Sequence, residues 1–200
     1  MNTPNKLTIL RMLLVPIMVI IAMIDLPFSV MNIPGNMIII DLLFIIGAIT
    51  DKIDGTLARK NNQVTTFGKF LDPIADKILV ISALIILVEK AKIPGWIPII
   101  IIVREFAVSG YRLIAVEKKG KVIAANIWGK LKTVTQMFAI ILAFIDVHKF
   151  GAFCTNSYQS IGIIPYIINV LTTVLLITCV VATIFSGYEY MKDGKDLLKD

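Results

Sequence analysis

The stretch DKIDGTLARKNNQVTTFGKFLDPIAD, residues 51–76, joins two long apolar segments and decides how they are arranged. Residues 60–68 in its middle are polar, which predicts a turn between two helices. A short turn brings consecutive helices back side by side and antiparallel. Four aspartates are therefore expected at the same end of the helix pair: Asp51, Asp54, Asp72 and Asp76.

The composition predicts a protein that is buried in lipid. Hydrophobic residues make up 57% of the 200 residues, 17% are charged, and the mean hydropathy is +0.84. Soluble domains average about 45–50% apolar and about 25% charged residues, so a soluble fold, a disordered chain and a disulfide scaffold are excluded. Cys154 and Cys179 are far apart and form no metal or redox motif.

Six segments have the roughly 20 apolar residues that a membrane-spanning helix needs. They cover residues 7–25, 36–58, 70–89, 95–116, 128–147 and 165–188. This pattern predicts an all-α integral membrane protein with six transmembrane helices, forming a single domain over residues 1–200. The charged tail, residues 189–200, is interpreted as a surface extension.

The distribution of positive charge predicts the orientation of the helices. With a cytoplasmic N-terminus, 17 of the 20 Lys and Arg residues lie toward the cytoplasm, and Lys90, Lys92 and Lys149 face out. Cytoplasmic loops carry an excess of Lys and Arg, so both termini are expected in the cytoplasm. The net charge of +6 then needs no nucleic acid to explain it.

The four aspartates are expected to form a metal site at the level of the cytoplasmic headgroups. Asp51 and Asp54 are i,i+3 neighbours and Asp72 and Asp76 are i,i+4 neighbours, so each pair shares a helix face. Carboxylates this close repel one another unless a cation lies between them. Ligands that are all oxygen suit Mg²⁺, Mn²⁺ or Ca²⁺. Four carboxylates are enough for two ions, the arrangement that clamps both oxygens of a phosphoryl transfer.

Structural roles for the same aspartates stay open at this point. Asp51 after Thr50, and Asp72 before Pro73, have the pattern of helix N-caps. Asp54 is within reach of an ion pair with Lys52 or Lys77. The small residues beside the cluster, Gly55, Ala58 and Gly68, suit either a shallow cleft or close helix packing. Arg59 has the guanidinium that pairs bidentately with phosphate.

The whole string, D-x-x-D-G-x-x-A-R, eight residues, then G-x-x-x-D-x-x-x-D, resembles the motif of the CDP-alcohol phosphatidyltransferases at all eight fixed positions. The resemblance implies that a hydroxyl attacks the lipid-side phosphorus of a CDP-alcohol and that CMP leaves. It implies two divalent ions, Mg²⁺ or Mn²⁺, on Asp51, Asp54 and Asp72, with Asp76 as general base and additional metal contact. Gly55, Ala58 and Gly68 then line the nucleotide site, Arg59 holds the diphosphate, and the protein is a homodimer.

Three further segments resemble one branch of that family, the bacterial phosphatidylglycerophosphate synthases. They are residues 2–11 (NTPNKLTILR), residues 104–112 (REFAVSGYR) and residues 129–136 (GKLKTVTQ). The branch implies CDP-diacylglycerol as donor, sn-glycerol 3-phosphate as acceptor, and a multi-pass protein of the bacterial cytoplasmic membrane.

The cationic residues of these later segments favour an acceptor that carries a phosphate. Arg104 and Arg112 are two i,i+4 steps apart, and Lys130 and Thr133 are i,i+3 neighbours on the next helix. Such donors bind a phosphate in a partly dry pocket, and Glu105 is placed to orient one of the arginines. The alternative is that these cations are interface anchors whose side chains reach out to the headgroups.

The sequence leaves other functions open. A second phosphatidylglycerol (as in a cardiolipin synthase), serine or an inositol phosphate are alternative acceptors within the family. A divalent-cation transporter with the aspartates as its ion site belongs to a different class. Transporters place such sites near the bilayer midplane, often between repeats. Here the aspartates lie at one end and no repeat is visible, which disfavours a transporter.

Overall fold

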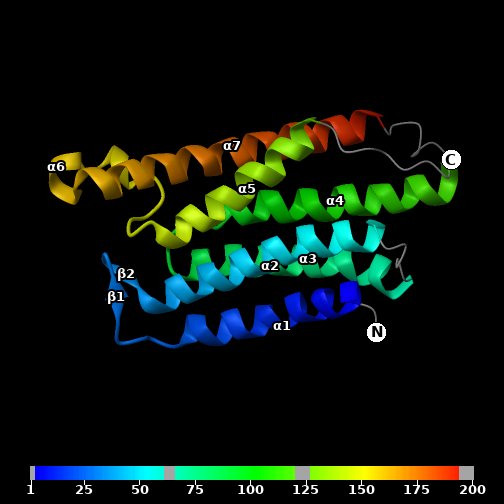
Figure 1. Cartoon of the computed structure of the whole chain (residues 1–200). Helices are drawn as coiled ribbons and strands as arrows, with labels where there is room; N and C mark the ends of the chain where they lie inside the picture. The colour runs from blue at the N-terminus through cyan, green and yellow to red at the C-terminus, as the bar shows by residue number, and fades with distance from the viewer. Residues whose placement is uncertain (1–2, 61–65, 120–126, 194–200) are drawn as a thin grey trace. The chain divides into compact units, whose positions relative to one another are not determined.

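The computed structural model describes residues 3–60, 66–119 and 127–193 and is almost entirely helical (Figure 1). The long helices of these ranges are α1 (Thr3–Met23), α2 (Gly35–Lys60), α3 (Thr66–Glu89), α4 (Trp96–Lys119), α5 (Ile127–Ile145) and α7 (Ile163–Asp193). The short elements are β1 (Ser29–Val30), β2 (Ile33–Pro34), the 3-10 helix η1 (Ala152–Cys154) and α6 (Tyr158–Ile161). Each long helix overlaps one of the six predicted apolar segments, so the all-α class is confirmed.

The chain forms two compact units. The first comprises Met1–Lys92 with Ala143–Val147, and the second comprises Ile93–Leu142 with His148–Asp200. In the first unit α1 packs against both α2 and α3, and α2 also contacts α3 (Figure 1). The buried residues of α1 recur at helical spacing, as Leu14, Met18 and Ala22. This period places one face of α1 against its two neighbours and leaves Leu13, Ile17 and Ile20 exposed.

A two-stranded hairpin reverses the chain between α1 and α2. β1 and β2 pair antiparallel, and the turn residues Met31 and Asn32 have φ values of 52° and 66°. Two consecutive residues with positive φ are the hallmark of the turn that matches the twist of a tight hairpin. The Asn36 side chain donates to the carbonyl of Ile24 over 3.1 Å, which ties the start of α2 to the segment after α1. Consequently α1 and α2 run antiparallel.

The helices α2 and α3 approach each other closely at Gly47. A Cβ atom on this buried glycine would lie 2.6 Å from Cδ2 and 3.2 Å from Cδ1 of Leu79. Leu79 is itself in the core of the unit, so it has little room to move aside. Gly47 precedes Asp51 by about one helical turn, so the contact fixes the spacing of α2 and α3 next to the aspartate segment.

We expect Gly47→Val to destabilise the protein by about 1–3 kcal/mol, the usual cost of overpacking a core. Gly110 in α4 is a matched control, because a Cβ there meets nothing within 4 Å. Thermal unfolding of both variants in detergent compares the two sites, with Gly110→Val expected within about 0.5 kcal/mol of the parent protein. Equal stability of the two variants would show that α2 and α3 are not in tight contact.

In the second unit α4 packs against α7, and side chains connect α5 to both. The Trp128 ring of α5 stacks on Phe185 of α7, with centroids 5.0 Å apart. The connection from α5 to α7 is held by polar side chains of α7. Buried Asn169 accepts from the Phe153 backbone amide and donates to the Lys149 carbonyl, both over 2.9 Å, and the Thr173 hydroxyl accepts from the Gly151 amide over 3.1 Å.

Within the described ranges, two helices are long and apolar enough to cross a bilayer. They are Ile127–Ile145 and Ile163–Lys192, and Leu7–Met23 and Gly35–Thr50 are shorter apolar helices. The full set of six spans and the orientation of the termini therefore stay predictions.

Candidate functional site

The aspartate motif lies on the two helices that were predicted to carry it. Asp51, Asp54, Gly55, Ala58 and Arg59 belong to the last three turns of α2, whereas Gly68, Asp72 and Asp76 belong to the first three turns of α3. The side chains of all of these except Asp76 lie outside the described part of the structure. The backbone supports convergence, because α2 and α3 are consecutive, packed and joined through residues 61–65.

Helix rise places the motif near the connected ends of α2 and α3. At about 1.5 Å per residue, Asp54 lies about 9 Å from the last residue of α2 and Asp72 about 9 Å from the first residue of α3. Asp51 and Asp76 lie about 14–15 Å from the same helix ends. Each aspartate thus lies within about 15 Å of the helix end that leads to residues 61–65. Figure 1 shows the end of α2 and the start of α3 at the same end of the first unit as the start of α1.

The structure decides against the N-cap interpretation of Asp51 and Asp72. α2 continues through Asp51 to Lys60, and the hydroxyl of Thr50 donates within that helix to the Ile46 carbonyl over 2.6 Å. α3 begins at Thr66, six residues before Asp72. Both aspartates are therefore inside helices, where a short acidic residue gains nothing from capping. Asp76 is half-buried between Ala75 and Lys77 on the third turn of α3.

The donor chemistry of the motif fits a hard divalent cation, because carboxylate oxygens are the only candidate ligands it supplies. Among the side chains that the structure describes, no three His, Cys, Asp or Glu residues come together. The carboxylates of Asp51, Asp54 and Asp72 lie outside these described side chains, so the metal site stays a prediction.

Arg11 of α1 is a further candidate that the sequence interpretation left without a role. It is fully buried, on the same face as Leu14 and Met18. At about 1.5 Å per residue it lies about 12 Å from the start of α1, at the depth of the aspartate positions. A charged residue inside an apolar helix is costly, which makes Arg11 a candidate functional residue, and the sequence did contain this signal.

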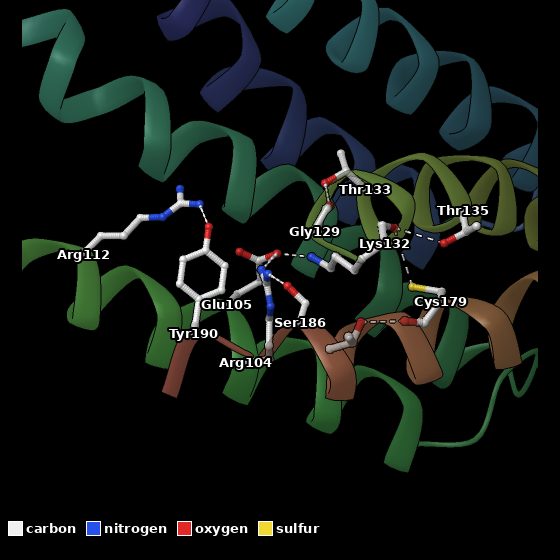
Figure 2. A network of polar contacts seen from close by, with 11 residues as sticks. Arg104, Glu105, Arg112, Gly129, Lys132, Thr133, Thr135, Cys179, Ser186 and Tyr190 are labelled. Carbon is white, nitrogen blue, oxygen red and sulfur yellow. Dashed lines mark hydrogen bonds and ion pairs between the residues drawn. The ribbon is translucent and has the colours of Figure 1, made fainter. Parts of the chain in front are cut away.

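A second polar cluster lies in the second unit, where α4, α5 and α7 bring together charged side chains (Figure 2). Arg104 of α4 donates to the Ser186 hydroxyl of α7, and its Nη1 lies 3.7 Å from Oε1 of Glu105. Arg112 of α4 donates to the hydroxyl of Tyr190. The predicted role of Glu105 in orienting an arginine is consistent with this geometry.

Lys132, rather than the predicted Lys130, is the buried cation of α5. Its ammonium donates to Glu105, and its side chain is 4% exposed. Its carbonyl also accepts from the Thr135 hydroxyl over 3.2 Å and faces the Cys179 sulfur at 3.9 Å. Lys130 and Thr133 are exposed, and the Thr133 hydroxyl donates to the Gly129 carbonyl over 3.0 Å. Lys130 and Thr133 are therefore not part of the network around Glu105, and their predicted contact with an acceptor needs other partners.

The periodicity of α5 contained a signal for Lys132. Counting back in helical steps from buried Ala143 and Ala139 reaches Thr135 and then Lys132, all of which are buried. Lys130 lies two residues earlier, on a different face.

The charged tail was predicted to be a surface extension from residue 189, and this is wrong for its first part. α7 continues to Asp193, and Tyr190 is only 3% exposed. α7 extends beyond its apolar stretch because Tyr190 packs against the arginines of α4 (Figure 2). Residues 194–200 lie outside the described part of the chain.

Known proteins resemble this chain along nearly its whole length. The sequence model of the CDP-alcohol phosphatidyltransferase family matches residues 1–185. A CDP-diacylglycerol–glycerol-3-phosphate 3-phosphatidyltransferase of Bacillus subtilis is 39% identical over 203 residues, which cover 99% of this chain and 97% of that protein. Proteins of the same name from Rickettsia bellii and Haemophilus influenzae are 36% and 35% identical, over 97% and 100% of this chain and 96% of each relative.

Proposed function

We propose a specific reaction for this chain, which belongs to the CDP-alcohol phosphatidyltransferase family and is therefore a transferase: transfer of a phosphatidyl group from CDP-diacylglycerol to sn-glycerol 3-phosphate, with release of CMP. The observation that carries the proposal is the similarity over almost the full length to three relatives that are named for this reaction. Both units would then serve one catalytic domain, since the family model covers nearly all of the chain.

Members of this family generally depend on divalent cations. We propose that Asp51, Asp54 and Asp72 hold two such ions, Mg²⁺ or Mn²⁺, and that Asp76 completes the set. When bound, these ions offset the charge of the diphosphate and make the acceptor hydroxyl more acidic. Support comes from the four aspartate positions near the connected ends of two packed helices.

The chain's own residues account for the remaining steps. Arg59 would hold the diphosphate by charge-assisted hydrogen bonds. Gly55, Ala58 and Gly68 would let the nucleotide approach the backbone closely. Asp76 would take the proton from the acceptor hydroxyl. The hydroxyl oxygen would attack the lipid-side phosphorus, and the bond from that phosphorus to CMP would break. The half-buried position of Asp76 suits a general base that meets a substrate.

The phosphate of the acceptor would be bound by the cations of the second polar cluster. We assign this role to Arg104 and Arg112, with Lys130 and Thr133 as further contacts. Both arginines lie against one tyrosine, so two guanidinium groups are held near each other. A dianionic phosphate offsets the repulsion between such neighbours, whereas an uncharged acceptor does not.

The chemistry also requires a membrane, because the acyl chains of the donor stay in lipid. We propose six transmembrane helices with both termini in the cytoplasm, a site at the cytoplasmic headgroup level, and a homodimer in the bacterial cytoplasmic membrane. Two long apolar helices support membrane association. Exposed apolar residues recur along α7, including Ile167, Leu171 and Val174, as expected for a surface that faces lipid.

The direct test is release of CMP by the purified protein in mixed micelles of CDP-diacylglycerol, glycerol 3-phosphate and Mg²⁺. Serine, inositol phosphate and phosphatidylglycerol, offered in place of glycerol 3-phosphate, separate the acceptors. We expect turnover with glycerol 3-phosphate and with none of the other acceptors. Greater turnover with any other acceptor, or none with all of them, would contradict the proposal.

We expect Arg112→Ala and Lys130→Ala to raise the KM for glycerol 3-phosphate about tenfold or more, with the KM for CDP-diacylglycerol nearly unchanged. A charge-assisted hydrogen bond to phosphate contributes about 1.5–3 kcal/mol, which corresponds to that factor. Lys149→Ala, which removes an exposed cation outside both clusters, is the matched control. If neither KM responds in the two test variants, these cations are interface anchors and the acceptor site lies elsewhere.

A further inference from the structure

Tyr190 is the residue at which the two arginines of α4 meet. The guanidinium carbon of Arg104 lies 5.7 Å from the centroid of the Tyr190 ring, and that of Arg112 lies 5.1 Å from the same centroid. The hydroxyl of Tyr190 accepts from Arg112, and Ser186, one turn earlier on α7, accepts from Arg104 (Figure 2). One turn of α7 therefore contacts both guanidinium groups.

We propose that Tyr190, supported by Ser186, is a positioning residue that holds Arg104 and Arg112 as a single clamp for the phosphate of the acceptor. This inference rests on the proposed function, because it assumes that the acceptor carries a phosphate. Tyr190 itself need not touch the substrate. It acts by fixing where the guanidinium groups lie before the acceptor arrives.

Charge explains why the arginines need such a support. Two guanidinium groups held near each other repel, and long arginine side chains would otherwise move apart into many rotamers. Glu105 offsets part of the charge on the Arg104 side, but its carboxylate is shared with buried Lys132. Among the described side chains, Arg112 meets a neutral hydroxyl and an aromatic ring but no carboxylate. Within the described side chains, no carboxylate offsets the positive charge of Arg112, which makes this guanidinium the better candidate for binding an anion.

An aromatic ring with a hydroxyl is well suited to this role. The ring attracts a cation through its quadrupole by about 0.5–2 kcal/mol, and it does so without adding a negative charge. A carboxylate at the same place would neutralise the arginines and compete with phosphate. Because Tyr190 is almost completely buried, its ring is also fixed in place, so the geometry exists before binding.

The experiment compares Tyr190→Phe, Tyr190→Leu and Ser186→Ala with the parent protein by steady-state kinetics in mixed micelles. Tyr188→Phe is the matched control, since Tyr188 lies two residues earlier on α7 and is 65% exposed. The inhibition constant of inorganic phosphate, which competes with glycerol 3-phosphate, provides a second readout of the anion site that does not require the acceptor hydroxyl. Thermal unfolding of each variant reports any loss of structure.

The expected result is a rise in the KM for glycerol 3-phosphate of about 3–10-fold in Tyr190→Phe, which removes one hydrogen bond to a charged group. Tyr190→Leu should show a larger rise, and inhibition by inorganic phosphate should weaken in parallel. The KM for CDP-diacylglycerol and the kcat should stay near the parent values, as should every constant of Tyr188→Phe.

Two results would overturn the inference while leaving the proposed reaction intact. One is an unchanged KM for glycerol 3-phosphate in both Tyr190 variants. The other is an equal loss in kcat and in both KM values together with a lower unfolding temperature, which would make Tyr190 a packing residue only. If the parent protein shows no glycerol 3-phosphate-dependent release of CMP, the proposed function itself fails, and the clamp fails with it.

Discussion

Asp72→Asn is expected to abolish phosphatidyl transfer, with activity reduced by at least about 10³-fold. Asparagine keeps the size of the side chain but removes the charge that a divalent cation requires, and bound metal contributes several kcal/mol to the transition state of a phosphoryl transfer. Asp54→Asn should behave in the same way. The measurements are release of CMP and the binding of Mn²⁺ to detergent-solubilised protein.

Two controls accompany this prediction. Asp25→Asn changes an exposed aspartate outside the motif and should retain full activity. Treating the parent protein with a chelator should remove activity, and added Mg²⁺ should restore it. Full turnover in excess chelator would mean that the aspartates do not act through metal ions.

Asp76→Asn is expected to preserve the fold and the binding of CDP-diacylglycerol while reducing turnover by roughly 10²–10⁴-fold, the usual contribution of a positioned base. Asn at this position cannot accept the proton of the attacking hydroxyl. The position supports this role, because Asp76 lies one turn beyond Asp72 on α3 and its side chain is half-buried beside the core residue Ala75.

Donor affinity and turnover, measured on one preparation of Asp76→Asn, separate the possible roles of this residue. Parallel loss of metal binding, donor binding and turnover would make Asp76 a metal ligand only. Near-normal turnover would exclude both the catalytic and the ligand role.

The presence of the long helices was predictable because a long run of apolar residues is a strong signal. The residues at which the helices begin and end were not predictable. The third apolar segment was expected from residue 70, and α3 begins four residues earlier at Thr66. The polar residues there do not interrupt the helix, although they do interrupt the apolar run. The last segment was expected to end at residue 188, and α7 reaches Asp193 because Tyr190 packs against the arginines of α4.

Spacing along one helix predicts which residues share a face, as for the aspartates of the motif, but it does not predict which residues meet across helices. The aspartates could be placed on matched faces from spacing alone. The contact of Glu105 with Lys132 joins residues 27 positions apart, and that of Arg112 with Tyr190 joins residues 78 apart. Spacing within one helix says nothing about such pairs. The period of buried residues on α7 did indicate the inward face, since Tyr190 follows Thr183 and Ser186 at helical steps.

The bonds of Asn169 and Thr173 to the connection before α7 have a consequence for how the protein is made. An unpaired amide inside a hydrophobic helix resists partitioning from the translocation channel into the bilayer. The partners of Asn169, the backbone groups of Phe153 and Lys149, precede it in the chain, and Asn169 meets them only once α7 has folded back onto this connection. In the membrane topology proposed above, we therefore expect α5, the connection and α7 to enter the bilayer together as a helical hairpin.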